Sequence, residues 1–85
     1  MRFDAQVEVR LRPGIADPES ATIERALPAL GFDDVSSMST GRSFRFEIEA
    51  ENEDGATERA WELARGLLAN PVMEDVSATV SPKRP

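Results

Sequence analysis

The chain has 85 residues, a length that allows one domain built around a single hydrophobic core. Apolar residues make up 40% of it, but 11 of them are alanine, so few large side chains are available for that core. Sixteen acidic residues against ten basic ones give a net charge of −6, and nine of the ten bases are arginine. A chain of this sign repels phosphate backbones and anionic lipids, so we expect neither nucleic acid nor a membrane as its partner.

Two residue types that carry much enzyme chemistry are missing from the chain. It has no cysteine and no histidine, which excludes disulfides, thiolate ligands and imidazole bases. Carboxylates are then the only plausible acid or base groups. No apolar run reaches the length of a signal sequence or a membrane span, so we expect a soluble cytoplasmic protein.

The first part of the chain predicts a strand and a helix. Apolar and polar residues alternate over residues 3–11, a period of two that is typical of a strand with one buried face. Asp17 favours a helix start, and the helix is expected from about Pro18 to Leu30, kinked or shortened by Pro28 and ended by Gly31. Its apolar side chains fall on one narrow stripe that should face a sheet: Ile23, Ala26, Leu27 and Leu30.

Two further strands are expected in the middle of the chain. Residues 35–40 alternate only weakly and predict a bulged or distorted second strand. Gly41 and Arg42 form the predicted turn after it. Residues 44–51 alternate as clearly as the first strand does and predict the third.

A second helix and a fourth strand complete the predicted domain. The helix is expected from about Ala56 to Ala69, because a proline disfavours helical geometry at the preceding residue, Asn70. Residues 76–80 predict the fourth strand, so residues 1–80 form one domain and residues 81–85 a flexible C-terminal tail. The order is β-α-β-β-α-β. Right-handed crossovers then place both helices on one face of a four-stranded antiparallel sheet, an α+β two-layer sandwich related to the ferredoxin-like fold.

The other face of this sheet is expected to be open and charged. Its outward positions on the first and third strands are Asp4, Gln6, Glu8, Arg10, Arg45, Glu47, Glu49 and Glu51. The acidic cluster could bind a divalent cation through its carboxylates. It consists of Glu47, Glu49, Glu51, Glu53 and Asp54. Strand residues two apart lie about 7 Å from each other, however, and no histidine accompanies them, so we interpret the cluster as a solvated face.

Gly41 and Arg42 also raise the question of phosphate binding. A glycine allows close backbone approach, and an arginine offers a forked donor to phosphate oxygens. No phosphate-loop motif accompanies the pair, so a hairpin turn is the simpler interpretation.

The second helix has a wider apolar arc than one sheet face requires. Its main stripe consists of Ala56, Ala60, Leu63, Ala64 and Leu67. Trp61 and Leu68 extend the arc to about 160°. Two interpretations stay open: these two residues close the rim of the core, or they form part of a protein contact, where tryptophan is favoured as an anchor.

Three separated blocks of the chain agree in order and spacing with one known family. They are Leu11-Arg-Pro-Gly-Ile-Ala-Asp-Pro18 with Thr22-Ile-Glu-Arg-Ala-Leu27 and Leu30-Gly-Phe32, then Gly41-Arg42, then Leu67-Leu-Ala-Asn-Pro-Val-Met-Glu-Asp-Val76. On these residues the chain resembles the PurS family, the small subunit of phosphoribosylformylglycinamidine synthase in de novo purine synthesis. It departs from the family where Arg42 replaces the usual lysine and Glu19-Ser20 the usual Gln-Gly or similar pair; arginine keeps the charge but changes the donor geometry.

The resemblance implies a PurS-like fold and a place in a three-protein enzyme. In such a complex a glutaminase subunit releases ammonia from glutamine. A large synthase subunit uses ATP and magnesium to convert formylglycinamide ribonucleotide to the amidine. The small subunit joins the two and supports ammonia transfer. The resemblance implies no catalytic, cofactor-binding or metal-binding residue in this chain.

The surfaces of the predicted domain suggest where it makes contacts. A domain this small with an uncovered sheet face is expected to form a homodimer or homotetramer. For contacts with the glutaminase and synthase subunits we predict Gly41 and Arg42 at the central turn, and Asn70 and Pro71 after the second helix.

Two other classes of function share the predicted topology. One is an ACT-like regulatory domain that binds an amino acid between paired domains, with the ligand at the Pro13-Gly14 loop. The other is an RNA-binding domain, which needs aromatic residues on the open sheet face. Phe3, Phe44 and Phe46 have the parity of the covered face instead, which argues against RNA.

The composition also suggests a hypothesis about the environment. Acids are in excess, lysine is almost absent and the core is padded with alanine. This combination suits a halophilic origin, in a cytoplasm whose salt screens the repulsion between like charges.

Overall fold

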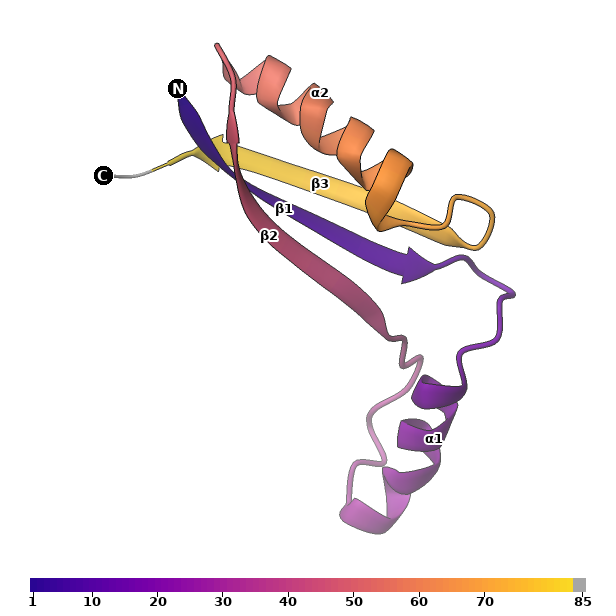
Figure 1. Cartoon of the computed structure of the whole chain (residues 1–85). Helices are drawn as coiled ribbons and strands as arrows, with labels where there is room; N and C mark the ends of the chain where they lie inside the picture. The colour runs from indigo at the N-terminus through magenta and orange to yellow at the C-terminus, as the bar shows by residue number, and fades with distance from the viewer. Residues whose placement is uncertain (84–85) are drawn as a thin grey trace.

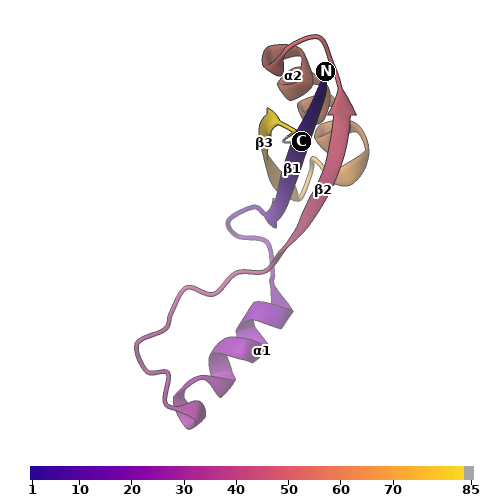
Figure 2. The same cartoon turned by 90° about the vertical axis from the view of Figure 1, so that its left-hand side faces the viewer.

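The computed structural model describes residues 1–83, which form a body and a projecting arm (Figure 1). The body is an antiparallel sheet in the order β2-β1-β3, made of β1 (Arg2–Leu11), β2 (Gly41–Glu49) and β3 (Glu74–Pro82). The helix α2 (Glu53–Leu63) lies along one face of this sheet. The arm, residues 12–40, carries α1 (Pro18–Ala26) beyond the end of the sheet (Figure 2).

The molecule is long and thin for its length. It measures 51 × 32 × 14 Å with a radius of gyration of 16.5 Å, whereas a compact domain of this length has about 12 Å. It exposes 6264 Å² of surface, about 1,300 Å² more than a folded monomer of its mass is expected to expose. The chain by itself therefore leaves a large part of its surface uncovered.

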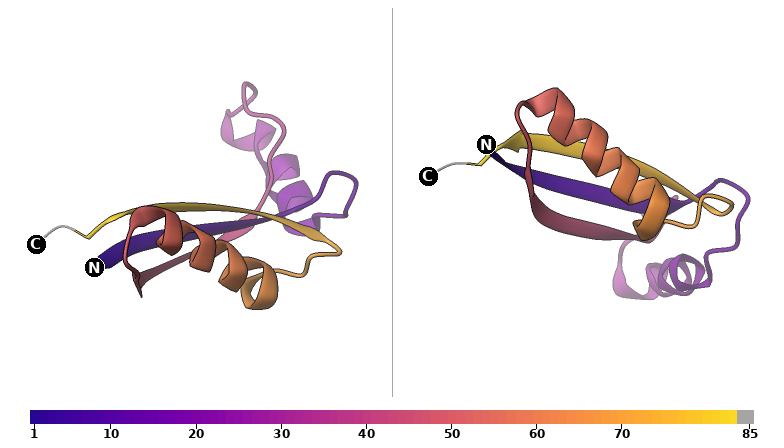
Figure 3. Two further views of the ribbon diagram at one scale, coloured as in Figure 1. Left: turned by 90° about the horizontal axis from the view of Figure 1, so that it is seen from above. Right: turned by 45° about the horizontal axis from the view of Figure 1, so that its top comes forward.

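β1 is the central strand, and its alternation is as predicted. α2 covers one face of the sheet (Figure 3). The apolar side chains at Phe3, Ala5, Val7 and Val9 are buried, while the polar residues between them are exposed or half-buried. The core consists of Phe3, Ala5, Val7 and Val9 from β1 and Ala56, Ala60 and Ala64 from the helical segment. Alanine lets the helix approach the sheet closely, but it provides little apolar area. The prediction of a thin core is confirmed.

α2 begins earlier than predicted because Asn52 caps it. The Asn52 side-chain oxygen accepts the backbone N–H of Gly55 at 2.8 Å, a bond that satisfies one of the free donors of the first turn. Two of the acidic residues of the predicted cluster, Glu53 and Asp54, occupy this first turn. Negative charge at a helix N-terminus is favourable, so these acids stabilise the helix.

α2 continues into a π-helical turn that changes which side chains face the sheet. In this turn, Ala64–Leu68, the N–H of Ala69 donates to the carbonyl of Ala64 at 3.0 Å. The wider turn brings Leu68 onto the core and leaves Leu67 76% exposed. The prediction that Leu67 faces the sheet is therefore wrong, and Leu68 closes the rim of the core.

Trp61 fits neither a fully buried core residue nor a fully exposed contact residue. It is half-buried, and the Arg65 guanidinium lies over its ring, 5.2 Å from the centroid. Such a contact shields one face of the indole with a charged group. The ring is thus neither fully buried nor free, and part of it remains accessible.

The arm carries its helix away from the sheet. α1 is capped by Asp17 and followed by a 3-10 turn at Pro28–Leu30, and Gly31 then takes a left-handed conformation with φ of 88°. The predicted cap, the shortening at Pro28 and the role of Gly31 are confirmed. The prediction that both helices cover one face of the sheet is wrong, since only α2 does so (Figures 1 and 2).

The predicted strand at residues 35–40 is not formed, so the part of the chain that the structure describes has three strands in the order β-α-β-α-β. Ser37 has a φ of 58°, which interrupts an extended run. The N–H groups of Met38 and Thr40 donate to carboxylates on α1 and at its cap. The segment therefore binds the helix of its own arm and does not join the sheet.

Asp17 ties the two legs of the arm together at the root. Its carboxylate accepts the N–H and hydroxyl of Ser20 at 3.1 and 2.7 Å, and the N–H and hydroxyl of Thr40 at 3.0 Å each. The hydroxyl of Ser20 contributes most to lowering the pKa of Asp17 to about 2, followed by the backbone N–H of Thr40. We call Asp17, Ser20 and Thr40 the arm clasp.

Gly41 and Arg42 are not a turn between two strands. They are the first residues of β2 and pair with Arg10 and Val9 of β1. A Cβ at Gly41 would lie 2.5 Å from the carbonyl oxygen of Val9, so the close approach of the two strands requires glycine here.

The end of the chain also differs from the prediction. Ser81 and Pro82 belong to β3 rather than to a tail, and the rest of the predicted tail beyond Lys83 lies outside the described residues. Among the helices of the described residues, none is long and apolar enough to cross a membrane.

Removing the largest core side chain should destabilise the body strongly. Phe3 is 1% exposed, so we expect Phe3→Ala to lower the free energy of unfolding by about 3–5 kcal/mol through lost burial and a cavity. Gln6→Thr, on the open face of the same strand, is the control and should cost about 0.5 kcal/mol or less. Urea denaturation followed by circular dichroism measures both, and equal effects would contradict the assignment of the core to one face of β1.

The arm clasp should titrate far below the usual range of an aspartate. The pKa of Asp17 in the folded state is about 2, against an ordinary value of 3.8. The charged carboxylate therefore stabilises the arm fully at neutral pH, and this contribution is lost as the pH falls through about 2. NMR shifts of the Ser20 and Thr40 amides should therefore follow a midpoint near pH 2. The amide of Gly55, bonded to the uncharged Asn52, is the control, and a midpoint near 3.8 for the clasp amides would contradict the prediction.

Candidate functional site

The residues predicted for partner contacts gather at one end of the body, where α2 ends and β2 and β3 begin (Figure 1). Arg42 comes from β2, whereas Asn70 and Pro71 come from the loop between the π turn and β3. Glu74, the first residue of β3, connects them. We call this region the α2 end and define it by Arg42, Leu68, Asn70, Pro71 and Glu74.

Arg42 and Glu74 form the central contact of the α2 end. One guanidinium nitrogen of Arg42 lies 3.0 Å from each carboxylate oxygen of Glu74 and donates to the carbonyl of Leu68 at 3.3 Å. β2 and β3 flank β1 on opposite sides, so this contact passes over the central strand. It thereby closes the end of the core below the last turn of the helical segment.

Glu74 is held in its charged form by this arrangement. Its side chain is 15% exposed, and one of its oxygens accepts the backbone N–H of Asn70 at 2.7 Å. That bond is the main cause that lowers the pKa of Glu74, and the Arg42 guanidinium adds to it. At neutral pH the carboxylate therefore links the loop, β2 and β3.

Asn70 shapes the loop that follows the helix. Its side-chain oxygen accepts the N–H of Val72 at 3.0 Å, and its carbonyl accepts the N–H groups of Met73 and Glu74 at 3.1 and 2.8 Å. The loop is therefore a compact turn, as expected for an asparagine followed by proline. Val72 is 78% exposed and Met73 41% exposed at its outer surface.

Arg12 is, with Glu74, one of the residues of this region that the sequence did not point to. Its guanidinium donates to the carbonyl of Pro71 at 2.6 Å and pairs with Asp75 at 3.2 Å, while its N–H donates to the carbonyl of Met73. Arg12 follows directly on the first predicted strand, and Asp75 directly precedes the residues predicted as the fourth. Their closeness could have been expected from the antiparallel pairing of those strands, which was the only available signal.

The chemistry of the α2 end suits binding rather than catalysis. Both arginines are bonded to carboxylates and carbonyl oxygens, and the groups that hold the loop are donors and acceptors paired with one another. The result is a rigid loop with apolar side chains at its surface. Such a surface is typical of a protein contact.

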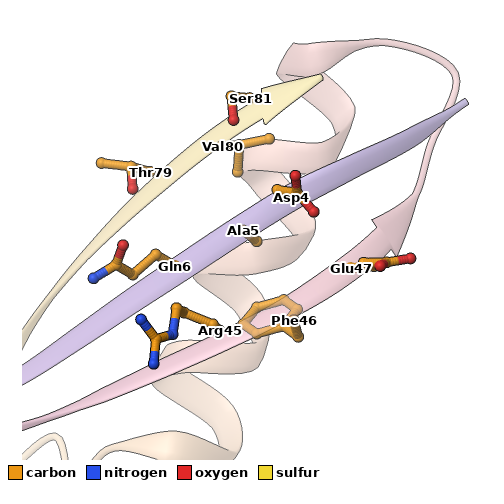
Figure 4. Close-up of a pocket in the computed structure, with 9 residues that line it drawn as sticks. All are labelled: Asp4, Ala5, Gln6, Arg45, Phe46, Glu47, Thr79, Val80 and Ser81. Carbon is orange, nitrogen blue, oxygen red and sulfur yellow. The ribbon is translucent and has the colours of Figure 1, made fainter. Parts of the chain in front are cut away.

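The sheet carries a hollow lined by polar side chains together with the apolar residues Ala5, Phe46 and Val80 (Figure 4). It has a volume of about 510 Å³ and is lined by side chains from all three strands, among them Asp4, Gln6, Arg45, Glu47 and Thr79. Acids, bases and amides alternate here without converging on one point (Figure 4). The hollow therefore has the character of a solvated sheet face.

The acids of β2 are used in ion pairs. Glu47 accepts from Lys83 at 2.7 Å, which is the main cause that lowers its pKa. Glu49 accepts from the N-terminal amine of Met1 at 3.0 Å, which lowers its pKa likewise. Within residues 1–83, no three acidic side chains lie together in a way that could hold a metal ion.

The sequence and the fold are similar to those of one family. The family described as "PurS: Phosphoribosylformylglycinamidine (FGAM) synthase" matches residues 4–82. A PurS subunit of this synthase from Methanocaldococcus jannaschii is 38% identical over 78 residues, which cover 92% of this chain and 94% of that protein. The one from Archaeoglobus fulgidus is 41% identical over 73 residues, covering 86% and 91%.

Solved structures agree with the sequence comparisons. The crystal structure of Methanocaldococcus jannaschii PurS superimposes with a TM-score of 0.84 at 36% identity, covering 96% of this chain and 99% of that one. A chain in the structure of PurLQS from Thermotoga maritima superimposes with a TM-score of 0.86 at 32% identity, covering 95% and 99%. The similarity therefore extends over the arm as well as the body.

The Arg42–Glu74 contact should keep the loop of the α2 end closed. We expect Arg42→Ala to raise amide hydrogen exchange at Asn70, Val72 and Met73 several-fold, because the carboxylate that holds the Asn70 N–H loses its partner. Mass spectrometry of peptides from this loop measures the change. Arg45→Ala, on the open face of the same strand, is the matched control, and unchanged exchange in the Arg42 variant would contradict the role of this contact.

Proposed function

The chain belongs to the PurS family and is a subunit of phosphoribosylformylglycinamidine synthase in purine biosynthesis, and from this premise we propose that it is a non-catalytic bridge between the other subunits. In this role it brings a glutaminase subunit and a large synthase subunit together. It supports the passage of ammonia from the first to the second.

The observation that carries the proposal is the match over nearly the whole chain to a protein found in PurLQS. The residue types support it, because the chain has no histidine and no cysteine. The α2 end supports it as well, since its side chains are committed to holding a loop in place. A fixed loop with Val72 and Met73 exposed on it is suited to docking on another subunit.

The proposal divides the chemistry among the three proteins. ATP and magnesium act on the synthase subunit and glutamine on the glutaminase subunit, while this chain binds no cofactor. The predicted contacts, Gly41, Arg42, Asn70 and Pro71, remain our proposal for the surface that meets these partners. Arg42, Asn70 and Pro71 are all exposed at that surface, and Arg42 and Asn70 also hold its loop through their bonds to Glu74.

Self-association and location form part of the same proposal. The uncovered surface favours a homodimer or homotetramer. The enzyme is expected in the cytoplasm, and the charge of −6 with one lysine supports a salt-rich one.

The topology of the chain does not favour the alternative of an ACT-like regulatory domain. That alternative was based on the shared β-α-β-β-α-β order, whereas residues 1–83 form three strands with α1 away from the sheet. RNA binding is disfavoured for the reason given by the sequence, since Phe3 is buried on the helix side of the sheet.

Reconstitution of the enzyme tests the bridge. Synthase and glutaminase subunits mixed with this chain should form the amidine from glutamine, and omission of the chain should abolish this activity by uncoupling ammonia release from its use. Activity with added ammonium in place of glutamine serves as the control and should persist without the chain. If glutamine supports the same rate with and without the chain, the proposed bridge is wrong.

A further inference from the structure

A small hollow lies between the π turn and the start of β3, two segments that meet at the α2 end (Figure 1). It has a volume of about 280 Å³, less than the roughly 300–1,000 Å³ of sites that enclose a small molecule. The hollow is therefore suited to a few side chains of another protein rather than to a cofactor. We call it the arginine groove and define it by Arg12, Arg65, Ala69, Pro71, Asp75 and Val76.

Arg65 offers an exposed guanidinium to the arginine groove. No ion pair formed within residues 1–83 includes it, and it lies over the ring of Trp61, 5.2 Å from the centroid. A guanidinium stacked on an aromatic ring keeps the N–H groups at its edge available, and these match the two oxygens of a carboxylate. Tryptophan and arginine are also the residue types that contribute most at the centre of protein contacts.

Arg12 is the second arginine of the groove, and its ion pair is open to competition. Its guanidinium pairs with Asp75 at 3.2 Å, and both side chains are about half exposed. It also donates to the carbonyl of Pro71 at 2.6 Å, which fixes its position. An ion pair this exposed is weak in water, so a carboxylate from outside the chain can compete with Asp75 for Arg12.

The charge at this end of the body is opposite in sign to that of the whole chain. The chain carries −6, whereas three arginines, Arg12, Arg42 and Arg65, stand here beside two carboxylates. Glu74 is already bonded to Arg42, and Asp75 to Arg12. One positive charge is left over in this part of the described structure, which a carboxylate of a partner can balance.

We propose that the arginine groove binds an acidic segment of a partner subunit, with one carboxylate of that segment between the Arg12 and Arg65 guanidiniums. An apolar side chain next to that carboxylate rests on Ala69 and Val76. This inference rests on the proposed bridging role, which it deepens by naming the docking surface and the chemistry of the segment that it takes. A single carboxylate with an apolar neighbour fits such a groove, whereas an extended polyanion is repelled by the net charge of the chain.

Charge reversal at Arg65 tests the groove by affinity. The full chain is immobilised, and its Kd is measured for the purified synthase subunit and for the purified glutaminase subunit at one salt concentration. Arg65→Glu should raise the Kd for one of the two roughly tenfold or more, because it repels the partner's carboxylate. Arg59→Glu reverses the same charge on the same helical segment, but Arg59 lines a different hollow. It is the control and should change both Kd values less than about twofold. No effect of Arg65→Glu, or equal effects of the two variants, would overturn the proposal.

The outcomes separate the groove from the bridging role. If Arg65→Glu binds both subunits like wild type while glutamine-dependent activity requires the chain, the groove is wrong and the bridge stands. If Arg65→Glu weakens binding while glutamine supports the same rate without the chain, the groove stands and the bridge is wrong. A wild type that binds neither subunit overturns both. Micromolar binding of acetate or inorganic phosphate by the chain alone, seen as amide shifts at Arg65 and Ala69, identifies a small-anion site and overturns the docking of a protein segment.

Removal of the Asp75 charge should have the opposite effect. We expect Asp75→Asn to lower the Kd for the same subunit several-fold, because Arg12 loses the carboxylate that competes with that of the partner. Asp4→Asn removes the same charge from an exposed position on β1 and is the control for a general effect of net charge. A Kd that stays the same or rises in Asp75→Asn, or that falls equally in both variants, contradicts the place of Arg12 in the groove and overturns the proposal.

Discussion

The central position of β1 is the constraint on which the rest of the structure depends. It is the only strand of the body with a neighbour on each side, and its alternating side chains divide the molecule into a covered face and an open one. The covered face receives a helix that contributes alanines to the core. Since the core is thin, the few large side chains of β1 must supply most of the burial that keeps the body folded.

The thin core explains why the ends of the body are held by polar contacts. Helix and sheet touch through small side chains, so apolar packing alone does not fix the loop after the π turn. Glu74 and Arg12 fix it through bonds to Asn70, Pro71 and Asp75. The open ends of the strands are tied in the same way, by Glu47 with Lys83 and Glu49 with the N-terminal amine.

The sequence predicted the elements whose signals are local. The period of two on β1 and β2, the Asp17 cap and the stop at Gly31 each depend on a few neighbouring residues, and each is found in the structure. The predicted strand at residues 35–40 failed because carboxylates distant in sequence take up its N–H groups. Leu67 was misplaced because the π turn shifts the helical period, which a search for a regular period of 3.6 residues does not detect.

In the candidate site, too, the local features could be predicted and the contacts between distant residues could not. Asn70 and Pro71 carry a local signal, because the proline marks the end of the helix, and the chain turns there in the structure. The bond of Arg42 to Glu74 could not be inferred, because it joins strands on opposite sides of β1 through side chains with several rotatable bonds. The alternation of the strand predicts which face Arg42 lies on, but it does not predict which residue Arg42 binds.

The segment Thr40-Gly41-Arg42 joins the arm to the body and shows how a small chain keeps an extended shape. Thr40 is bonded to Asp17 of the arm, and Arg42 to Glu74 of the body. In each case a carboxylate accepts from a backbone N–H of one segment and from a side chain of another. Between them Gly41 lies so close to β1 that no side chain fits. The direction of the arm is therefore fixed by polar contacts on both sides of one glycine, and the apolar residues of the arm remain available for a surface outside their own chain.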